Sequence, residues 1–106
     1  MNEQKLRELQ MTEQALHQIM MQKQQFQSIA FETENALKEL ESSAKAYRII
    51  GELMIEADKS KTKTDLEKKK ELAEVRIKSF DSQEEKLREK SKQLQTELEK
   101  ELAKNE

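Results

Sequence analysis

Apolar side chains recur through the first forty residues at alternating spacings of three and four positions. Two interleaved series form this seam: Leu9, Leu16, Lys23, Ala30 and Leu37, with Thr12, Ile19, Phe26, Thr33 and Leu40. The same spacing reaches Ala44 and Tyr47. Because such a seam is typical of a coiled-coil helix, and no Gly or Pro interrupts it, it predicts a helix over residues 3–43.

A seam of the same kind runs through the second half of the chain. It consists of Leu66, Ala73, Phe80, Leu87 and Leu94, together with Lys70, Ile77, Glu84, Ser91 and Leu98. This pattern predicts a second helix over residues 60–103. Thr64, followed three residues later by Glu67, fits a capping box at the start of this helix, and Ser60 is an alternative cap.

The segment between the two seams is apolar, β-branched and contains the single glycine of the chain. It predicts a β-hairpin over residues 46–57, with Gly51-Glu52 as a type II′ turn. This turn would place two residue pairs opposite each other: Ile50 with Leu53, and Ile49 with Met54. A continuous buried helix is the alternative. The hairpin makes the helices antiparallel, so the expected fold is mainly α, an antiparallel two-helix coiled coil in one elongated unit spanning residues 1–106.

Two seam positions carry opposite charges, Lys23 and Glu84. A partly buried charge without a partner is costly, so the register that pairs these two side chains is favoured. We expect an exchange of both charges to be milder than the removal of one. In this register the coiled-coil core consists of Leu16, Ile19, Lys23, Phe26, Leu37, Leu40, Leu66, Ala73, Ile77, Phe80, Glu84, Leu87 and Leu94.

Two parts of the expected fold lack a partner within the chain. An isolated hairpin is marginally stable in water, and both faces of this one are apolar, so it is expected to oligomerise. The oligomerisation residues would be Tyr47, Ile49, Ile50, Gly51, Leu53, Met54 and Ile55. At the far end of the coiled coil, flexible apolar side chains suit weak, unselective apolar contacts, although frayed seam residues are the alternative. The residues that cluster at this end are Leu6, Leu9, Met11, Leu98 and Leu102.

The composition supports long helices rather than a compact core. The chain is 40% charged and 34% hydrophobic, and its 20 basic and 22 acidic residues are mixed along the sequence. The mixing argues against a nucleic-acid site and against a helix on a membrane surface. No apolar stretch could span a bilayer, the first residues lack a signal-peptide core, and there is no Cys, which together predict a soluble, cytoplasmic protein.

The sequence offers no constellation for catalysis. His17 is the only histidine, so no multi-histidine metal site can form. Acidic pairs such as Glu84-Glu85 have no pocket, Ser42-Ser43 has no base in a catalytic pattern, and no Gly-rich phosphate loop exists. We therefore expect no catalytic residues, no metal and no cofactor, and a protein that is not an enzyme. Two non-enzymatic functions fit such a fold: unselective apolar binding at the tips, or a structural coiled-coil adaptor that binds one folded partner.

Several segments resemble the beta-type subunits of the prefoldin chaperone family. In the first helix the similarity rests on Gln22-Lys23-Gln24 and on Ala36-Leu37-Lys38-Glu39-Leu40. Its centre is the hairpin, Tyr47-Arg48-Ile49-Ile50-Gly51-Glu52-Leu53-Met54-Ile55, and it continues with the spacing of Leu66, Leu72, Val75-Arg76-Ile77, Phe80 and Gln83-Glu84. The connection from Leu40 to Tyr47 is shorter than is usual in the family, so the first helix is expected to run almost into the strand.

The resemblance implies a hexamer of two alpha-type and four beta-type subunits. Their hairpins would build a β-barrel platform from which the coiled coils project. The tips would capture non-native proteins and deliver them to a group II chaperonin without nucleotide hydrolysis. The client-binding residues would then be Leu6, Leu9, Met11, Leu98 and Leu102. The implied partners are therefore prefoldin alpha-type subunits, other beta-type copies, unfolded clients and the chaperonin, with no nucleic acid and no membrane.

Overall fold

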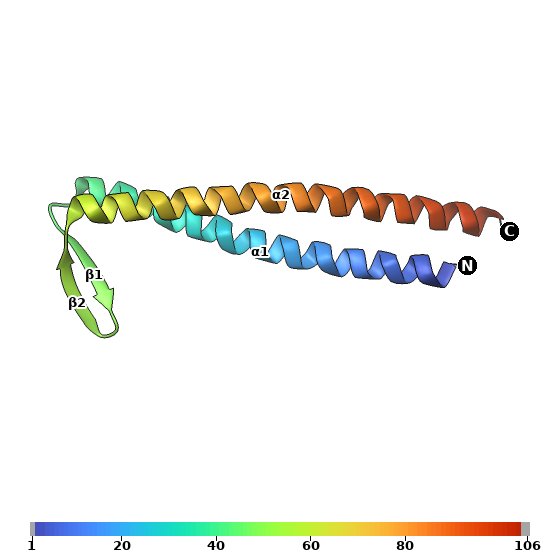
Figure 1. Ribbon diagram of the computed structural model, residues 1–106, viewed down its shortest axis with the longest axis horizontal. Coiled ribbons are helices and arrows are strands. Elements are labelled where there is room, and N and C mark those ends of the chain that lie inside the picture. Colours follow the sequence, from blue (N-terminus) through green and yellow to red (C-terminus); the bar gives the residue numbers. More distant parts are fainter. Residues whose placement is uncertain (1, 105–106) are drawn as a thin grey trace. The chain divides into compact units, whose positions relative to one another are not determined.

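The computed structural model describes residues 2–104; residues 1, 105 and 106, the ends of the predicted unit 1–106, lie outside the described residues. Its elements follow in the order α1 (Asn2–Ser42), β1 (Ala46–Ile50), β2 (Leu53–Ala57) and α2 (Lys59–Lys104) (Figure 1). The hairpin over residues 46–57 is confirmed, and the alternative of a continuous helix is wrong. Both helices begin one residue earlier than predicted, α1 ends one residue earlier and α2 extends one residue further.

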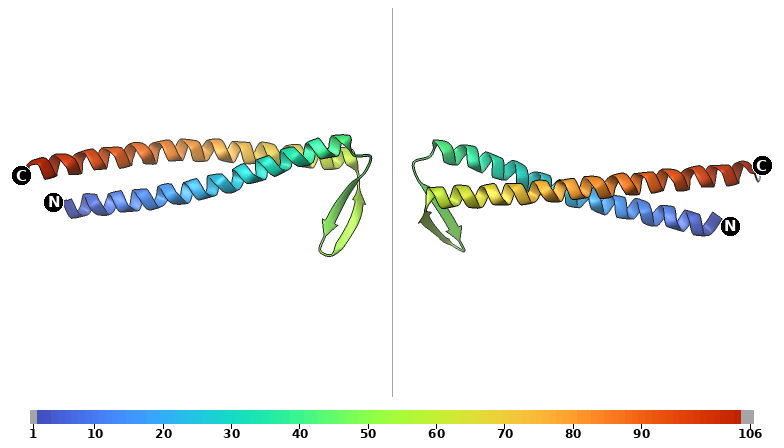
Figure 2. Two further views of the ribbon diagram at one scale, coloured as in Figure 1. Left: turned by 180° about the vertical axis from the view of Figure 1, so that it is seen from behind. Right: turned by 45° about the horizontal axis from the view of Figure 1, so that its top comes forward.

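The chain divides into two compact units. The terminal unit comprises residues 1–24 and 78–106, and the hairpin unit comprises residues 25–77. In the terminal unit, Lys5 lies beside Glu101 and Lys23 beside Glu84, so the two helix segments run antiparallel. In the hairpin unit, the end of α1 and the start of α2 lie side by side, and the hairpin projects away from them (Figure 2).

Seam positions are the protected positions of both units. Leu94 and Phe80 are buried in the terminal unit, and Leu40 and Ala73 are buried in the hairpin unit. Most side chains on the outer faces of the helices are polar and exposed, and Phe31 and Leu72 are exposed apolar exceptions. The seam therefore buries a narrow apolar stripe, as the three-and-four spacing requires. The extension of this seam to Ala44 and Tyr47 is wrong, because α1 ends at Ser42 and both residues are exposed.

Two threonines occupy buried seam positions of α1. Thr12 Oγ1 donates a hydrogen bond to the backbone oxygen of Glu8 (2.7 Å), and Thr33 Oγ1 donates one to that of Ile29 (2.6 Å). A buried hydroxyl without a partner is destabilising, and the carbonyl one turn earlier removes this cost. The two threonines are thus accommodated in the seam without a polar partner on α2.

A short connection joins α1 to the hairpin. The backbone N–H of Ser43 donates to the oxygen of Leu40 (3.2 Å), which closes the last turn of α1. Lys59 Nζ donates to the backbone oxygen of Ser43 (2.6 Å), so a cation at the start of α2 satisfies a carbonyl just beyond α1. Only residues 43–45 separate α1 from β1, which confirms that the helix runs almost into the strand.

Asp58 caps α2. Its Oδ1 accepts hydrogen bonds from the backbone N–H groups of Ser60 (2.9 Å) and Lys61 (3.2 Å), the arrangement of a helix N-cap. Thr64 lies inside the helix, where its hydroxyl donates to the oxygen of Ser60 (3.1 Å). The prediction of Thr64 or Ser60 as the cap is therefore wrong. Asp58 directly follows β2, so the turn out of the strand and the start of the helix coincide.

Candidate assembly and client-binding surfaces

The hairpin has the register expected from a two-residue turn. Its strands are antiparallel, with Ile50 paired to Leu53 and Ile49 paired to Met54, as predicted. Gly51 has a φ of 60°, and no other described residue has a positive φ. A positive φ at the first turn position alone fits a type II′ turn, whose twist matches the twist of the flanking strands.

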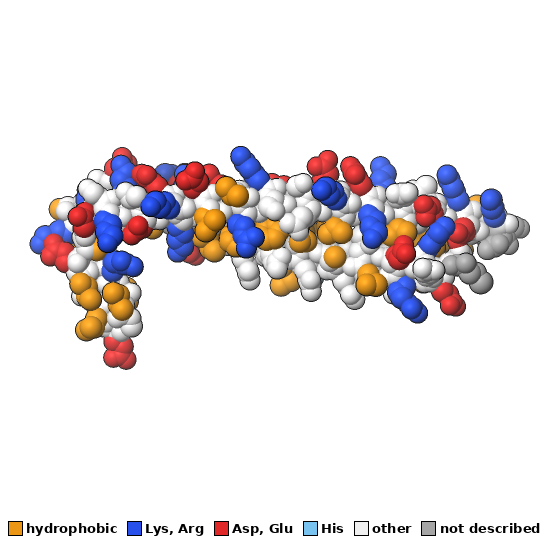
Figure 3. Space-filling view, viewed as in Figure 1, with side chains coloured by type: hydrophobic (Ala, Val, Ile, Leu, Met, Phe, Trp, Pro, Cys, Tyr) orange, Lys and Arg blue, Asp and Glu red, His pale blue; other side chains and the backbone are white. Residues whose placement is uncertain are grey.

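Both faces of the hairpin are apolar and open to solvent. Because paired residues point to the same side of a sheet, Tyr47, Ile49 and Met54 form one face, and Ile50, Leu53 and Ile55 form the other. These six side chains are 46–72% exposed. Figure 3 shows hydrophobic side chains on the surface of the projecting hairpin. Exposed apolar patches are typical of association sites, and an isolated two-stranded hairpin is only marginally stable in water.

The residues predicted for the core lie at protected positions of the helix pairs. Four of them are buried: Leu40, Ala73, Phe80 and Leu94. Nine are half-buried: Leu16, Ile19, Lys23, Phe26, Leu37, Leu66, Ile77, Glu84 and Leu87. In the hairpin unit, the guanidinium carbon of Arg76 lies 5.6 Å from the centre of the Phe26 ring, a cation–π contact that adds to the seam.

A charged cluster joins the helices of the terminal unit. Lys23 Nζ forms ion pairs with Asp81 and with Glu84 (3.4 Å), and Glu84 also pairs with Arg88 (3.2 Å). Hydrogen bonds from Lys23 to Asp81 and Glu84 raise the pKa of Lys23 above 10.5, against partial desolvation. Hydrogen bonds from Arg88 and Lys23 hold the pKa of Glu84 below 4.5. The predicted register is confirmed here, but the seam pattern alone did not reveal Asp81 or Arg88.

The five predicted client-binding residues differ in their exposure to solvent. Leu6, Met11 and Leu102 are 49%, 63% and 61% exposed. Leu9 and Leu98 are half-buried in the seam. Lys5 links the helices at this end through Glu101 (2.8 Å) and Glu97 (3.5 Å). Three apolar side chains are thus presented next to a charged contact that keeps the two helix ends together.

The sequence predicts no metal site, and residues 2–104 bear on this expectation. No group of three or more His, Cys, Asp or Glu side chains in this part of the chain could hold a metal ion. His17 is exposed on α1. No helix in the same part of the chain is long and apolar enough to cross a membrane. One groove lies in the hairpin unit, where charged side chains such as Glu34 and Lys63 surround Leu37 and Leu40.

Known proteins are similar to this chain in sequence and architecture. The family model described as "Prefoldin subunit" matches residues 3–105. The chain is 34% identical to prefoldin subunit beta of Methanothrix thermoacetophila over 100 residues, which cover 92% of this chain and 83% of that protein. It is 35% identical to prefoldin subunit beta of Thermococcus kodakarensis, covering 92% and 86%. The crystal structure of the prefoldin beta subunit from Thermococcus strain KS-1 superimposes with a TM-score of 0.87, at 34% identity, over 95% of this chain and 91% of that one.

Proposed function

The chain belongs to the prefoldin family, and we propose that it is a beta-type chaperone subunit that captures non-native proteins without ATP and delivers them to a group II chaperonin. Members of the family form hetero-oligomers with other prefoldin subunits. For this chain we infer a hexamer with alpha-type subunits and further beta-type copies, acting in the cytoplasm. No step of this function requires a catalytic residue or a cofactor.

The exposed hairpin carries this proposal. Six large side chains on two faces cannot be buried by the helices to which the hairpin is attached, as their exposures show. Hairpins from other subunits can bury them, because strand edges pair with strand edges and apolar faces pack on apolar faces. A closed arrangement of hairpins removes all free edges, which favours a barrel over an open sheet.

Client capture would use the open end of the terminal unit. Burial of apolar surface contributes about 25 cal/mol per Å², so a site as small as Leu6, Met11 and Leu102 binds an unfolded segment weakly. Several such sites on one oligomer bind the same client cooperatively through a high effective concentration. Weak individual contacts also allow the client to leave stepwise for the chaperonin.

A truncation separates capture from assembly. Removal of residues 1–11 together with 98–106 is expected to abolish suppression of aggregation of a diluted, chemically unfolded client, measured by light scattering. Native mass spectrometry with an alpha-type subunit should show the same oligomer as the full chain. If the truncated oligomer protects the client as well as the intact one, the capture site is wrong. Binding to one folded protein but to no unfolded client would instead favour an adaptor.

A further inference from the structure

The two helices of the hairpin unit carry opposite net charges. Between residues 25 and 42, α1 has four acidic side chains and one basic one, a net charge of −3. Between residues 59 and 77, α2 has seven basic and four acidic side chains, a net charge of +3. The whole chain has a net charge of only −2, so this separation is a local property.

No ion pair joins the two helices among the described residues of the hairpin unit, although Arg76 lies over the Phe26 ring and Lys59 donates to the backbone oxygen of Ser43. Among the described residues of this unit, the helical ion pairs Lys38–Glu34 (3.9 Å) and Lys70–Glu74 (4.0 Å) each lie within one helix. The terminal unit differs, because Lys5 and Lys23 each pair with acidic residues of the other helix. The charge separation of the hairpin unit is therefore available to a partner.

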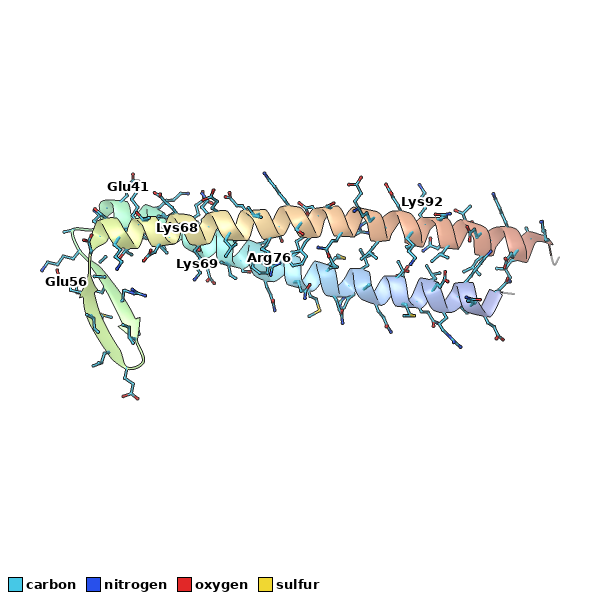
Figure 4. All side chains as sticks on the ribbon, viewed as in Figure 1. Glu41, Glu56, Lys68, Lys69, Arg76 and Lys92 are labelled. Atoms are coloured by element: carbon cyan, nitrogen blue, oxygen red, sulfur yellow. The ribbon has the colours of Figure 1, made fainter. Side chains whose placement is uncertain are left out.

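An apolar patch lies within the basic face of α2. Leu72 is 63% exposed and Val75 is 58% exposed. Lys68 and Lys69 lie four and three residues before Leu72, and Arg76 lies four after it, so these positions share one side of α2. Arg76 reaches over the Phe26 ring of α1 (5.6 Å), which leaves Lys68 and Lys69 as the cations beside the apolar patch that are open to a partner. Figure 4 labels the three cations along this stretch of α2. Lys68 and Lys69 form no ion pair within residues 2–104, although Asp65 lies on the same face two turns earlier.

The acidic helix offers a matching surface. Phe31 is 66% exposed on α1, the largest exposed fraction of any aromatic side chain described. Glu32 and Glu34 lie on either side of it around the helix, and Lys38 is the one cation nearby. An aromatic side chain flanked by carboxylates complements two aliphatic side chains flanked by cations.

We propose that these two surfaces join neighbouring copies of this chain, with Leu72 and Val75 of one copy packed against Phe31 of the next. The inference rests on the proposed function, because assembled hairpins are what hold two hairpin units side by side. The contact is head to tail: one copy contributes the basic face of α2, and its neighbour contributes the acidic face of α1. Such a contact would set the spacing of neighbouring helix pairs around the hairpin platform.

The absence of native Cys makes a direct test possible. Phe31→Cys is introduced into one batch of chain and Leu72→Cys into a second batch that carries a mass tag. The batches are co-assembled, alone and with an alpha-type subunit, and oxidised with diamide. We expect a disulfide between the two batches and few disulfides within either batch. Met21→Cys, also on exposed α1 surface, replaces Phe31→Cys as the matched control and should not react.

Charge reversal then tests complementarity. Lys68→Glu with Lys69→Glu in the Leu72→Cys batch should lower the disulfide yield about fivefold at low salt, from the size of exposed ion pairs. Adding Glu32→Lys and Glu34→Lys to the other batch should restore it. If the oligomer is intact but this disulfide does not form, the proposed contact is wrong. The contact is also wrong if the disulfide yield does not change on charge reversal. Neither result contradicts the proposed function. A chain that forms no oligomer overturns both the contact and the proposed function.

Discussion

Lys23 and Glu84 meet in the terminal unit because neither charge is tolerated alone at a half-buried seam position. The two seams, aligned antiparallel, were sufficient to predict this pair. They were not sufficient to predict Asp81 or Arg88, which flank the seam and reach it only through particular side-chain conformations. These neighbours change one expectation. Exchanging the charges of Lys23 and Glu84 would set like charges against Asp81 and Arg88, so the exchange should be nearly as harmful as a single removal.

Glu84 should give the terminal unit a measurable sensitivity to acid. Because its pKa is lowered in the folded chain, its ion pairs stabilise the fold above the ordinary value of 4.5 and are lost as pH falls through the lowered pKa. We expect Glu84→Gln to lower Tm at pH 7 and to reduce the further loss of Tm below about pH 4.5. Circular dichroism melts across this range measure both effects. Glu85→Gln, a neighbour outside the cluster, should retain the acid response of the original chain.

Gly51 should tolerate Asn better than Ala. Among the described residues, no atom beyond its two chain neighbours would lie within 4 Å of a Cβ added to Gly51, so space is not the obstacle. The obstacle is the positive φ of 60°, which costs an L-residue about 1–2 kcal/mol and costs Asn less. We expect Gly51→Ala to shift assembly with an alpha-type subunit to higher protein concentration, and Gly51→Asn to shift it less, as measured by analytical ultracentrifugation. Equal shifts would show that backbone strain at the turn does not limit assembly.

Long elements were easier to predict than their ends. A periodic seam over forty residues is a strong signal for a helix, and Gly51 between apolar pairs is a strong signal for the hairpin. The start of α2 was assigned to the wrong cap because Thr64 and Ser60 fit capping patterns, whereas Asp58, two positions before Ser60, was not predicted as a cap. Only the path of the chain out of β2 decides among them, and this path is a tertiary property.

Two substitutions test whether Asp58 or Thr64 is the N-cap of α2. Asp58→Ala removes two hydrogen bonds to backbone N–H groups and should destabilise α2 by about 1 kcal/mol. Thr64→Ala removes only a hydroxyl that donates to a carbonyl inside the helix, and it should be nearly neutral. Urea unfolding followed by circular dichroism compares the two variants with the original chain. A larger loss for Thr64→Ala would restore the capping box predicted from the sequence.

At the scale of the whole molecule, the sequence could indicate that the hairpin needs partners but not which surfaces beyond it take part. The adjacent residues Ile49 and Ile50 predict that both faces of the hairpin are apolar, because neighbouring strand residues point to opposite faces of a sheet. The opposite charges of the two helices in the hairpin unit become informative only when the structure shows that they do not pair across the seam. The predicted client-binding residues also differ in exposure: Leu6 is exposed, whereas Leu9 is half-buried. The sequence pattern did not distinguish them.

Client protection should depend on assembly more strongly than on any single tip. Ile49→Asp with Ile50→Asp places a charge on each face of the hairpin, where burial against another hairpin becomes unfavourable. Helicity should be unchanged, because no helix seam is altered, whereas native mass spectrometry should show dispersed subunits. Loss of multivalency is expected to weaken apparent client affinity by about 10² or more, measured by light scattering at equal chain concentration. Met21→Asp, an equally charged change on exposed α1 surface, should keep both assembly and protection. Undiminished protection by dispersed subunits would mean that one helix pair suffices, and the shared platform would then have no part in capture.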